Sequence, residues 1–123
     1  MSRSAMLIRD VAALLGVSTD TVRYYEREGL LDDRHIARRP NRYRDYGEAA
    51  VERLRLLVQA RRSGMSIAEI KTLAEAFDDG TLTIDLQLKL LRDKLADLDR
   101  QTRELNATRT AIAAKIDDLE SRR

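Results

Sequence analysis

The 123-residue sequence contains no cysteine, no tryptophan, a single histidine and only 4% aromatic residues. Without cysteine it has no disulfide framework, no thiolate metal site and no redox thiol, and one histidine leaves very few other soft metal ligands. It also lacks a catalytic Ser/His/Asp or Cys/His set and a phosphate-binding loop. The acids at positions 78, 79, 85, 93, 97 and 99 are interpreted as solvated helix faces. We therefore expect no bound cofactor, no metal site and no enzymatic activity.

Long hydrophobic runs are absent as well. The start of the chain carries only the apolar stretch Met6-Leu7-Ile8, which is too short for the apolar region of a signal peptide or for a membrane span. We therefore expect a soluble, cytoplasmic protein with no membrane partner. The high content of Ala, Leu, Glu, Arg and Lys favours helices over sheets, so the expected fold is mostly α-helical.

Charge is distributed unevenly along the chain. Residues 1–65 contain 13 Lys and Arg against 9 Asp and Glu, a net charge of +4, whereas residues 66–123 contain 10 against 12, a net charge of −2. The positive excess therefore lies in the N-terminal part, where it favours contact with a polyanion such as nucleic acid.

The start of the chain predicts two short helices joined by a tight turn. Residues 7–15 are expected to form a helix that ends at Gly16, because glycine tolerates the positive φ angle that closes a helix. Ser18 stands at a natural N-cap position for a second helix that ends near Glu28. Two short helices separated by a Gly-Val-Ser turn are typical of a helix-turn-helix, here over residues 8–28. The apolar face of the first helix is expected to comprise Leu7, Ile8, Val11, Ala12, Leu14 and Leu15.

The second helix has the two faces that a DNA-reading helix needs. Helical spacing places Val22 and Tyr25 on one face, where they fix the helix on its domain. Arginine binds guanine or phosphate in bidentate fashion, and a tyrosine hydroxyl donates to phosphate while its ring packs. We therefore interpret Thr19 to Glu28 as a recognition helix. Its polar face carries Thr19, Asp20, Arg23, Tyr24 and Arg27.

Residues 32–46 lose helical character and are interpreted as a two-stranded wing. The Pro40-Asn41 pair marks a turn, and the alternation in residues 43–46 suits a short strand. Five arginines without an intervening acid suit a phosphate backbone, and a loop that is merely solvated is the alternative. The only histidine, His35, is expected to be solvated or to contact phosphate rather than to bind a metal. The five arginines are Arg34, Arg38, Arg39, Arg42 and Arg44.

A pair of helices over residues 48–77 completes the first domain. Ser66 and Glu69 form a capping box, in which each side chain satisfies a free amide at the start of the second helix of the pair. We therefore assign residues 1–77 to a winged helix-turn-helix DNA-binding domain. Residues 78–123 are assigned to a linker and a dimerisation helix.

From residue 84 onward apolar residues recur with the alternating spacing of a heptad repeat. Only Thr102 and Arg109 interrupt this apolar seam. A long helix with a lone apolar stripe needs a partner, and a second copy of the chain is the simplest one, so we predict a homodimer. The apolar seam residues are Ile84, Leu88, Leu91, Leu95, Leu98, Leu105, Ile112, Ile116 and Leu119.

The heptad pattern itself is compatible with parallel and with antiparallel pairing. A parallel pair in register would stack Arg109 on Arg109, where two guanidiniums repel each other and lose hydration. Antiparallel pairing separates them and brings each towards Asp93, Asp97 and Asp99 in the first half of the other helix. We expect an antiparallel coiled coil in which Arg109 specifies the register. A bound anionic effector at Arg109 is the alternative.

The run from Val11 to Leu31, through the Gly-Val-Ser turn to Arg-Tyr-Tyr-Glu, closely resembles the N-terminal signature of the MerR family of transcriptional regulators. Residues 43–46 resemble the wing strand of that family, and residues 63–70 resemble its second helix pair. The closing coiled coil matches in position and period. The resemblance thus covers nearly the whole chain, and the Gly-Val-Ser to Arg-Tyr-Tyr-Glu run is its most specific part.

The resemblance implies a nucleoid-associated bacterial regulator that binds a palindromic operator in double-stranded DNA as an antiparallel homodimer. It also implies that the protein bends and untwists promoter DNA so that RNA polymerase engages both promoter elements. Arg39 of the basic loop is added to the predicted DNA contacts. The matching recognition-helix residues are Ser18, Thr19, Thr21, Arg23, Tyr24 and Arg27, and the matching wing residues are Arg42, Tyr43 and Arg44.

This sequence departs from the family pattern at two places, and it also lacks the sensing cysteines of some relatives. Arg42 stands where glycine is usual before the Tyr-Arg pair, so the turn of the wing differs or gains a phosphate contact. Gly47 replaces the usual polar cap of the next helix, which costs about a few tenths of a kcal/mol. The cysteines of metal-sensing and redox-sensing relatives have no counterpart in residues 80–83. We expect no effector domain, and the sequence identifies no inducer.

Two other classes of protein are compatible with parts of this pattern. An architectural DNA-binding protein would bind many sites, whereas a regulator prefers one palindrome by roughly 10³-fold or more. A coiled-coil adaptor with an incidental basic loop is the other alternative, and the polar face of the second helix argues against it.

The seam generates the first prediction. Exchange of Leu91 and Leu98 together for Asp should give a monomer that no longer binds a palindromic duplex, because both substitutions place charge in the apolar seam. Sedimentation equilibrium reports the oligomeric state, and a mobility-shift titration reports DNA binding. A monomer that still binds the full palindrome tightly would contradict the predicted dimer.

Overall fold

The computed structural model describes residues 6–38 and 44–123, and the chain divides into two compact units, Met1–Leu82 and Thr83–Arg123. The boundary between the units therefore lies five residues beyond residue 77, the predicted end of the first domain. The backbone amides of Thr81 and Leu82 donate to the carbonyl oxygen of Ala76 at 2.9 and 3.1 Å, which holds these residues to the first unit. None of the described helices is long and apolar enough to cross a membrane.

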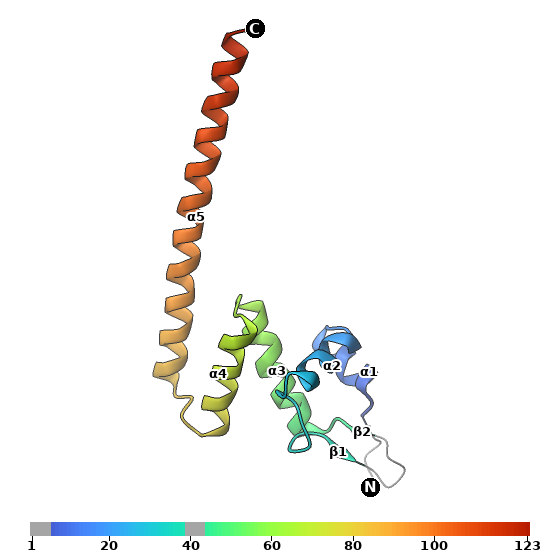
Figure 1. The fold of residues 1–123 in the computed structure, drawn as a ribbon. Coiled ribbons are helices and arrows are strands. Elements are labelled where there is room, and N and C mark those ends of the chain that lie inside the picture. Colours follow the sequence, from blue (N-terminus) through green and yellow to red (C-terminus); the bar gives the residue numbers. More distant parts are fainter. Residues whose placement is uncertain (1–5, 39–43) are drawn as a thin grey trace. The chain divides into compact units, whose positions relative to one another are not determined.

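The helix-turn-helix is confirmed (Figure 1). Helix α1, Ile8–Leu15, ends at Gly16, whose φ of 69° is in the left-handed region that favours glycine. Helix α2, Thr19–Arg27, begins after Ser18, whose Oγ accepts the backbone N–H of Thr21 at 3.1 Å. The predicted end of the first helix at Gly16 and the predicted N-cap of the second helix at Ser18 are therefore correct.

The apolar face of α1 is narrower than predicted. Val11 and Ala12 are buried, but Leu14 is 57% exposed, and Leu7 is the N-cap residue rather than part of the helix. At 100° per residue, Leu14 lies about 110° from the centre of the face formed by Ile8, Val11, Ala12 and Leu15. The inclusion of Leu14 in the core was wrong because the turn of the helix carries it out to the surface.

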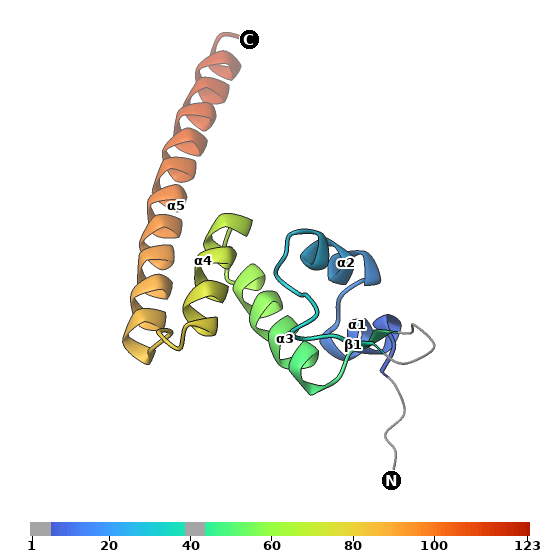
Figure 2. The same ribbon diagram turned by 60° about the horizontal axis from the view of Figure 1, so that its bottom comes forward.

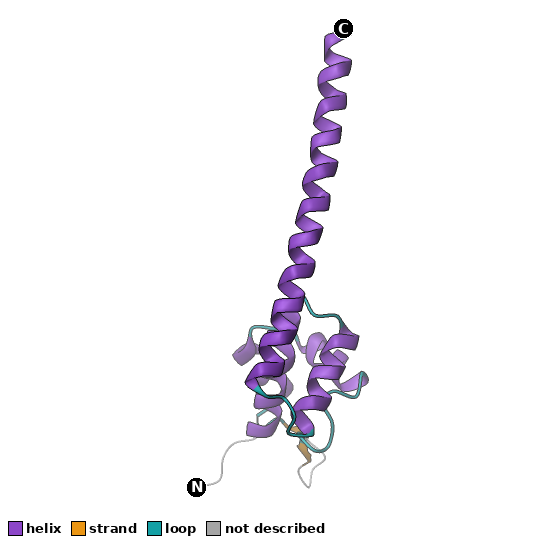
Figure 3. Ribbon diagram, turned by 90° about the vertical axis from the view of Figure 1, so that its left-hand side faces the viewer, coloured by secondary structure: helices purple, strands orange, loops and turns teal. Residues whose placement is uncertain are grey.

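The wing is a short antiparallel pair (Figure 3). Strand β1, Ala37–Arg38, pairs with β2, Arg44–Asp45, with Ala37 opposite Asp45. Met6 joins this pair, because its N–H donates to Oδ1 of Asp45 at 3.0 Å and its carbonyl oxygen accepts the N–H of Tyr46 at 2.9 Å. The predicted turn and the predicted contacts Arg39, Arg42 and Tyr43 lie outside the described residues.

Two further helices complete the first unit (Figure 2). Helix α3, Glu48–Arg62, packs against α1 and against α4, Ile67–Asp78. The capping box that opens α4 is confirmed: the N–H of Glu69 donates to Ser66 Oγ at 3.2 Å, and the N–H of Ser66 donates to Glu69 Oε1 at 2.9 Å. The fully buried side chains come from every part of the unit, namely Val11, Val22, Leu31, Tyr46, Leu54, Leu57 and Ile70.

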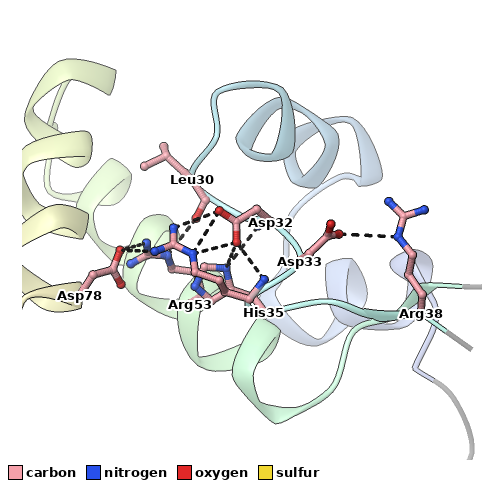
Figure 4. A network of polar contacts seen from close by, with 8 residues as sticks. Leu30, Asp32, Asp33, His35, Arg38, Arg53 and Asp78 are labelled. Carbon is pink, nitrogen blue, oxygen red and sulfur yellow. Dashed lines mark hydrogen bonds and ion pairs between the residues drawn. The ribbon is translucent and has the colours of Figure 1, made fainter.

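A buried arginine on α3 joins the end of the helix-turn-helix to the end of α4 (Figure 4). Arg53 is 3% exposed; its Nε donates to the carbonyl oxygen of Leu30 at 2.9 Å, and its Nη2 donates to Oδ2 of Asp78 at 2.6 Å. Its Nη1 is buried without a hydrogen-bond partner among the described residues. Asp78 is an exposed residue, as expected, and its carboxylate also pairs with this guanidinium, which the sequence did not predict.

His35 occupies the same network (Figure 4), which corrects its predicted role. The side chain is 13% exposed, and its Nδ1 accepts the backbone N–H of Asp32 at 3.3 Å. Burial, together with the nearby Arg53 guanidinium, lowers the pKa of His35 below its usual value. The histidine is a neutral, half-buried structural residue and not a solvated or phosphate-contacting one.

The second unit is one continuous helix, α5, Ile84–Ser121 (Figure 3). It begins after Thr83, whose Oγ1 accepts the N–H of Leu86 at 3.1 Å, and its 38 residues extend over about 57 Å. The predicted long helix is confirmed. Every apolar residue of its seam is exposed, from 39% at Leu88 to 75% at Ile84.

The Arg53 network generates a stability prediction. Asp78→Asn should lower the free energy of unfolding by about 2 kcal/mol, because it leaves a buried guanidinium without a counter-charge. Asp79→Asn is the matched control, since Asp79 is the next residue and has no ion pair within residues 6–38 and 44–123. Urea unfolding at one fixed protein concentration measures both. Equal effects of the two substitutions would show that the Arg53–Asp78 pair does not stabilise the unit.

Candidate nucleic-acid interface

Helix α2 has the two faces that the sequence predicted. Val22 and Tyr25 are buried at 0% and 3% exposure and fix the helix on the unit. Arg23, Tyr24 and Arg27 are exposed on the other side. The helix therefore presents two guanidiniums and a phenol to solvent from a rigid support, which is the arrangement that base-edge and phosphate contacts require.

The first turn of α2 is already organised by hydrogen bonds. Ser18 Oγ and Thr21 Oγ1 lie 2.9 Å apart, and Ser18 also caps the helix. Nη1 of Arg23 donates to Thr19 Oγ1 at 3.3 Å and to Asp20 Oδ1 at 3.2 Å. The Asp20 side chain is 91% exposed, so this pair orients Arg23 at little energetic cost and is readily exchanged for a nucleic-acid partner.

An ion pair connects the wing to the recognition helix. Arg44 of β2 donates through Nη1 to Oε1 of Glu26 on α2, and the Tyr46 hydroxyl donates to Oε2 of the same carboxylate at 3.3 Å. The Glu26 side chain is 11% exposed, whereas that of Arg44 is 43% exposed. Glu26 escaped the sequence analysis because an acid in a basic region looks unfavourable for DNA binding. Its signal was the Tyr-Tyr-Glu run, in which Glu26 directly follows the buried Tyr25.

Burial raises the pKa of both tyrosines of this region above its usual value. Burial is the main cause that raises the pKa of Tyr46, and the Glu26 carboxylate raises it further, against the opposing effect of Arg44. Burial also raises the pKa of Tyr25. Both hydroxyls therefore remain hydrogen-bond donors at neutral pH.

Acids outside the arginine-rich stretch neutralise part of its charge. Nε and Nη2 of Arg34 donate to the two oxygens of Asp32, each at 3.0 Å, and these bonds lower the pKa of Asp32 to about 2. Arg38 pairs with Asp33 at 3.6 Å. Together with the Glu26 pair of Arg44, each described arginine of the stretch has an acidic partner, so the wing is less positive than its sequence indicates.

A groove runs beside the recognition helix. It has a volume of about 580 Å³ and is bounded by α2 residues and by residues of α3 and α4. Arg61 is exposed on its wall and donates through Nη1 to the carbonyl oxygen of Met65 at 3.3 Å. Arg61 carries no signal in the sequence, because it becomes a neighbour of α2 only through packing. No cluster of metal-ligating side chains occurs in the part of the chain that the structure describes.

Comparisons with known proteins agree on one family. The model of the MerR HTH family regulatory protein matches residues 6–76, and that of MerR, DNA binding, matches residues 51–115. The HTH-type transcriptional regulator CueR of Escherichia coli O157:H7 is 33% identical over 110 residues, which are 89% of this chain and 79% of that protein. The matched relatives are transcriptional regulators rather than enzymes.

Two solved structures are similar in fold. HiNmlR, a MerR family regulator lacking the sensor domain and bound to promoter DNA, has a TM-score of 0.62 at 30% identity, over 81% of this chain and 74% of that one. PbrR691 from Ralstonia metallidurans CH34, in complex with lead(II), has a TM-score of 0.71 at 28% identity, over 91% and 83% of the two chains.

The contact between wing and recognition helix generates the third prediction. Glu26→Gln keeps the shape of the side chain but removes the charge that holds Arg44, so it should lower the free energy of unfolding by about 1 kcal/mol. It should also speed hydrogen exchange of the β1–β2 amides, measured by NMR. Asp20→Asn, which removes an exposed acid from the same helix, serves as control. Unchanged exchange in Glu26→Gln would contradict a role of Glu26 in holding the wing.

Proposed function

The chain belongs to the MerR family of DNA-binding transcriptional regulators, and we propose that it acts as a homodimer on a palindromic operator. The observation that carries the proposal is the exposed polar face of α2, which is held beside the wing strand by the Glu26–Arg44 pair. A helix fixed on both sides presents its arginines in one orientation, which sequence reading requires.

The recognition helix supplies the contacts that select sequence. Arg23 and Arg27 are exposed and long enough to reach base edges, where a guanidinium binds the two acceptors of guanine. Tyr24, which is 38% exposed, donates to a phosphate while its ring packs. Ser18, Thr19 and Thr21 lie at the start of α2. The free backbone amides of a helix N-terminus, with neighbouring hydroxyls, favour a phosphate.

The wing supplies contacts to the DNA backbone. We propose that the wing binds phosphates of the DNA strand next to the recognition helix, through Arg39, Arg42 and Tyr43. Arg44 has a double role, because its pair with Glu26 positions the wing while part of its guanidinium remains exposed. These contacts add affinity without sequence preference.

Two such units, joined through α5, would occupy the two half-sites of the operator. We propose that they distort promoter DNA so that RNA polymerase engages it, at a deformation cost of about 1–10 kcal/mol that the protein contacts offset. The place of action is then the nucleoid. The similarity of this chain to HiNmlR, which is bound to promoter DNA, supports the proposal.

Loss of one recognition-helix arginine tests the proposal. Arg23→Ala should weaken binding to the preferred palindrome by about 1–3 kcal/mol and relax base preference at one position in each half-site. The duplex is first selected from a random pool with the unchanged protein, and affinities are then measured by fluorescence anisotropy.

Arg103→Ala on α5 is the control, since it removes the same charge from the other unit. Unchanged affinity in Arg23→Ala would mean that α2 is not the recognition helix. Selection of no preferred sequence by the unchanged protein would instead support an architectural role.

A further inference from the structure

The charged residues of α5 differ in whether they have a partner within the helix. Most of those away from the seam are paired along its surface, such as Lys89 with Asp93 at 2.7 Å and Arg100 with Glu104 at 3.0 Å. Arg109, the one charge within the seam, has no ion pair or hydrogen bond in the described chain. Asp99, which directly follows the seam residue Leu98, also has none there. Both are therefore available to a partner helix.

Antiparallel pairing of two α5 helices limits the possible registers. In the heptad repeat, Thr102 and Arg109 stand at position a, and Leu91, Leu98 and Leu105 stand at position d. In an antiparallel pair each position a faces a position d of the other helix, so one facing pair defines the register. In two registers, every seam residue except one faces a seam residue of the partner helix. In the first, Arg109 faces the partner's Leu91; in the second, Arg109 faces the partner's Leu98. Any other heptad register leaves more of the exposed leucines and isoleucines in water.

Charge separates these two registers. In the first, each Arg109 lies beside the partner's Arg92, and the two Asp99 side chains approach each other across the symmetry axis, so like charges meet three times. In the second, Arg109 lies beside the partner's Asp99, and the symmetry of the dimer makes this contact twice. A guanidinium in an apolar seam loses hydration, and an adjacent carboxylate offsets that loss.

We propose that α5 pairs with a second copy of itself in the register that sets each Arg109 against the partner's Asp99, with Thr102 facing the partner's Leu105 near the centre. This inference rests on the proposed homodimer and specifies how it is built. The polar pair fixes the register, because a slip of one heptad replaces two attractive contacts by repulsive ones.

Disulfide mapping tests the register in the full chain, which has no native cysteine. Differently tagged Thr102→Cys and Leu105→Cys chains, mixed and oxidised, should cross-link to each other as the dominant product. Thr102→Cys mixed with Leu98→Cys reports the first antiparallel register, and Leu119→Cys by itself reports parallel pairing. Dominance of either of those products overturns the proposal. A wild-type chain that sediments as a monomer overturns the homodimer itself, which separates the two failures.

Charge exchange gives an independent readout. Arg109→Asp should raise the dimer dissociation constant at least about tenfold, and the double exchange Arg109→Asp with Asp99→Arg should return it to within about threefold of wild type. Arg103→Asp, away from the seam, should change it less than about twofold. In the first register Arg109→Asp would face Arg92 and tighten the dimer. Tighter association, or no rescue by the double exchange, would overturn the proposal.

Discussion

The buried guanidinium of Arg53 is the interaction on which the architecture of the DNA-binding unit depends. It ties the carbonyl oxygen of Leu30, where the chain leaves the helix-turn-helix, to the carboxylate of Asp78, where α4 ends. A buried arginine costs free energy unless its hydrogen bonds are made. The requirement to satisfy this one side chain therefore holds Leu30 and Asp78 in place. The position of α2 relative to α3 and α4, and therefore of its exposed arginines, follows from this constraint.

The basic face of the unit is restrained by acids of the same chain. Arg23, Arg44 and Arg34 hold Asp20, Glu26 and Asp32, respectively. A phosphate or a base edge must replace such a partner, which is easy at the exposed Asp20 and harder at Glu26 because that carboxylate is largely buried. Arg44 therefore acts mainly as a positioning residue, whereas Arg23 is free to change partners. Preorganisation of this kind favours discrimination between sequences over bulk affinity.

Local signals in the sequence were sufficient for the elements of the fold, and tertiary contacts account for what they missed. Gly16, Ser18 and the Ser66 capping box act within a few residues, so their consequences could be predicted without knowledge of the packing. Arg53 pairs with Asp78 and lies near His35, and it comes from a distant part of the chain, so neither contact could be predicted from local sequence. The acid that restrains Arg44 lies 18 residues away in the sequence, so charge counting along the wing overestimated its free positive charge. The DNA contacts, and the antiparallel seam, stay predictions.

In the proposed homodimer, the exposed seam of α5 would make DNA binding depend on the amount of the protein in the cell. Pairing of two α5 helices would remove their exposed leucines and isoleucines from water, so folding and association would be coupled through mass action. Below the dissociation constant of the dimer, the concentration of the DNA-binding form rises with the square of the protomer concentration. Doubling the gene dosage would then raise operator occupancy about fourfold in that regime. In the proposed dimer, the long helix would thus convert a gradual change in synthesis into a steeper change in transcription.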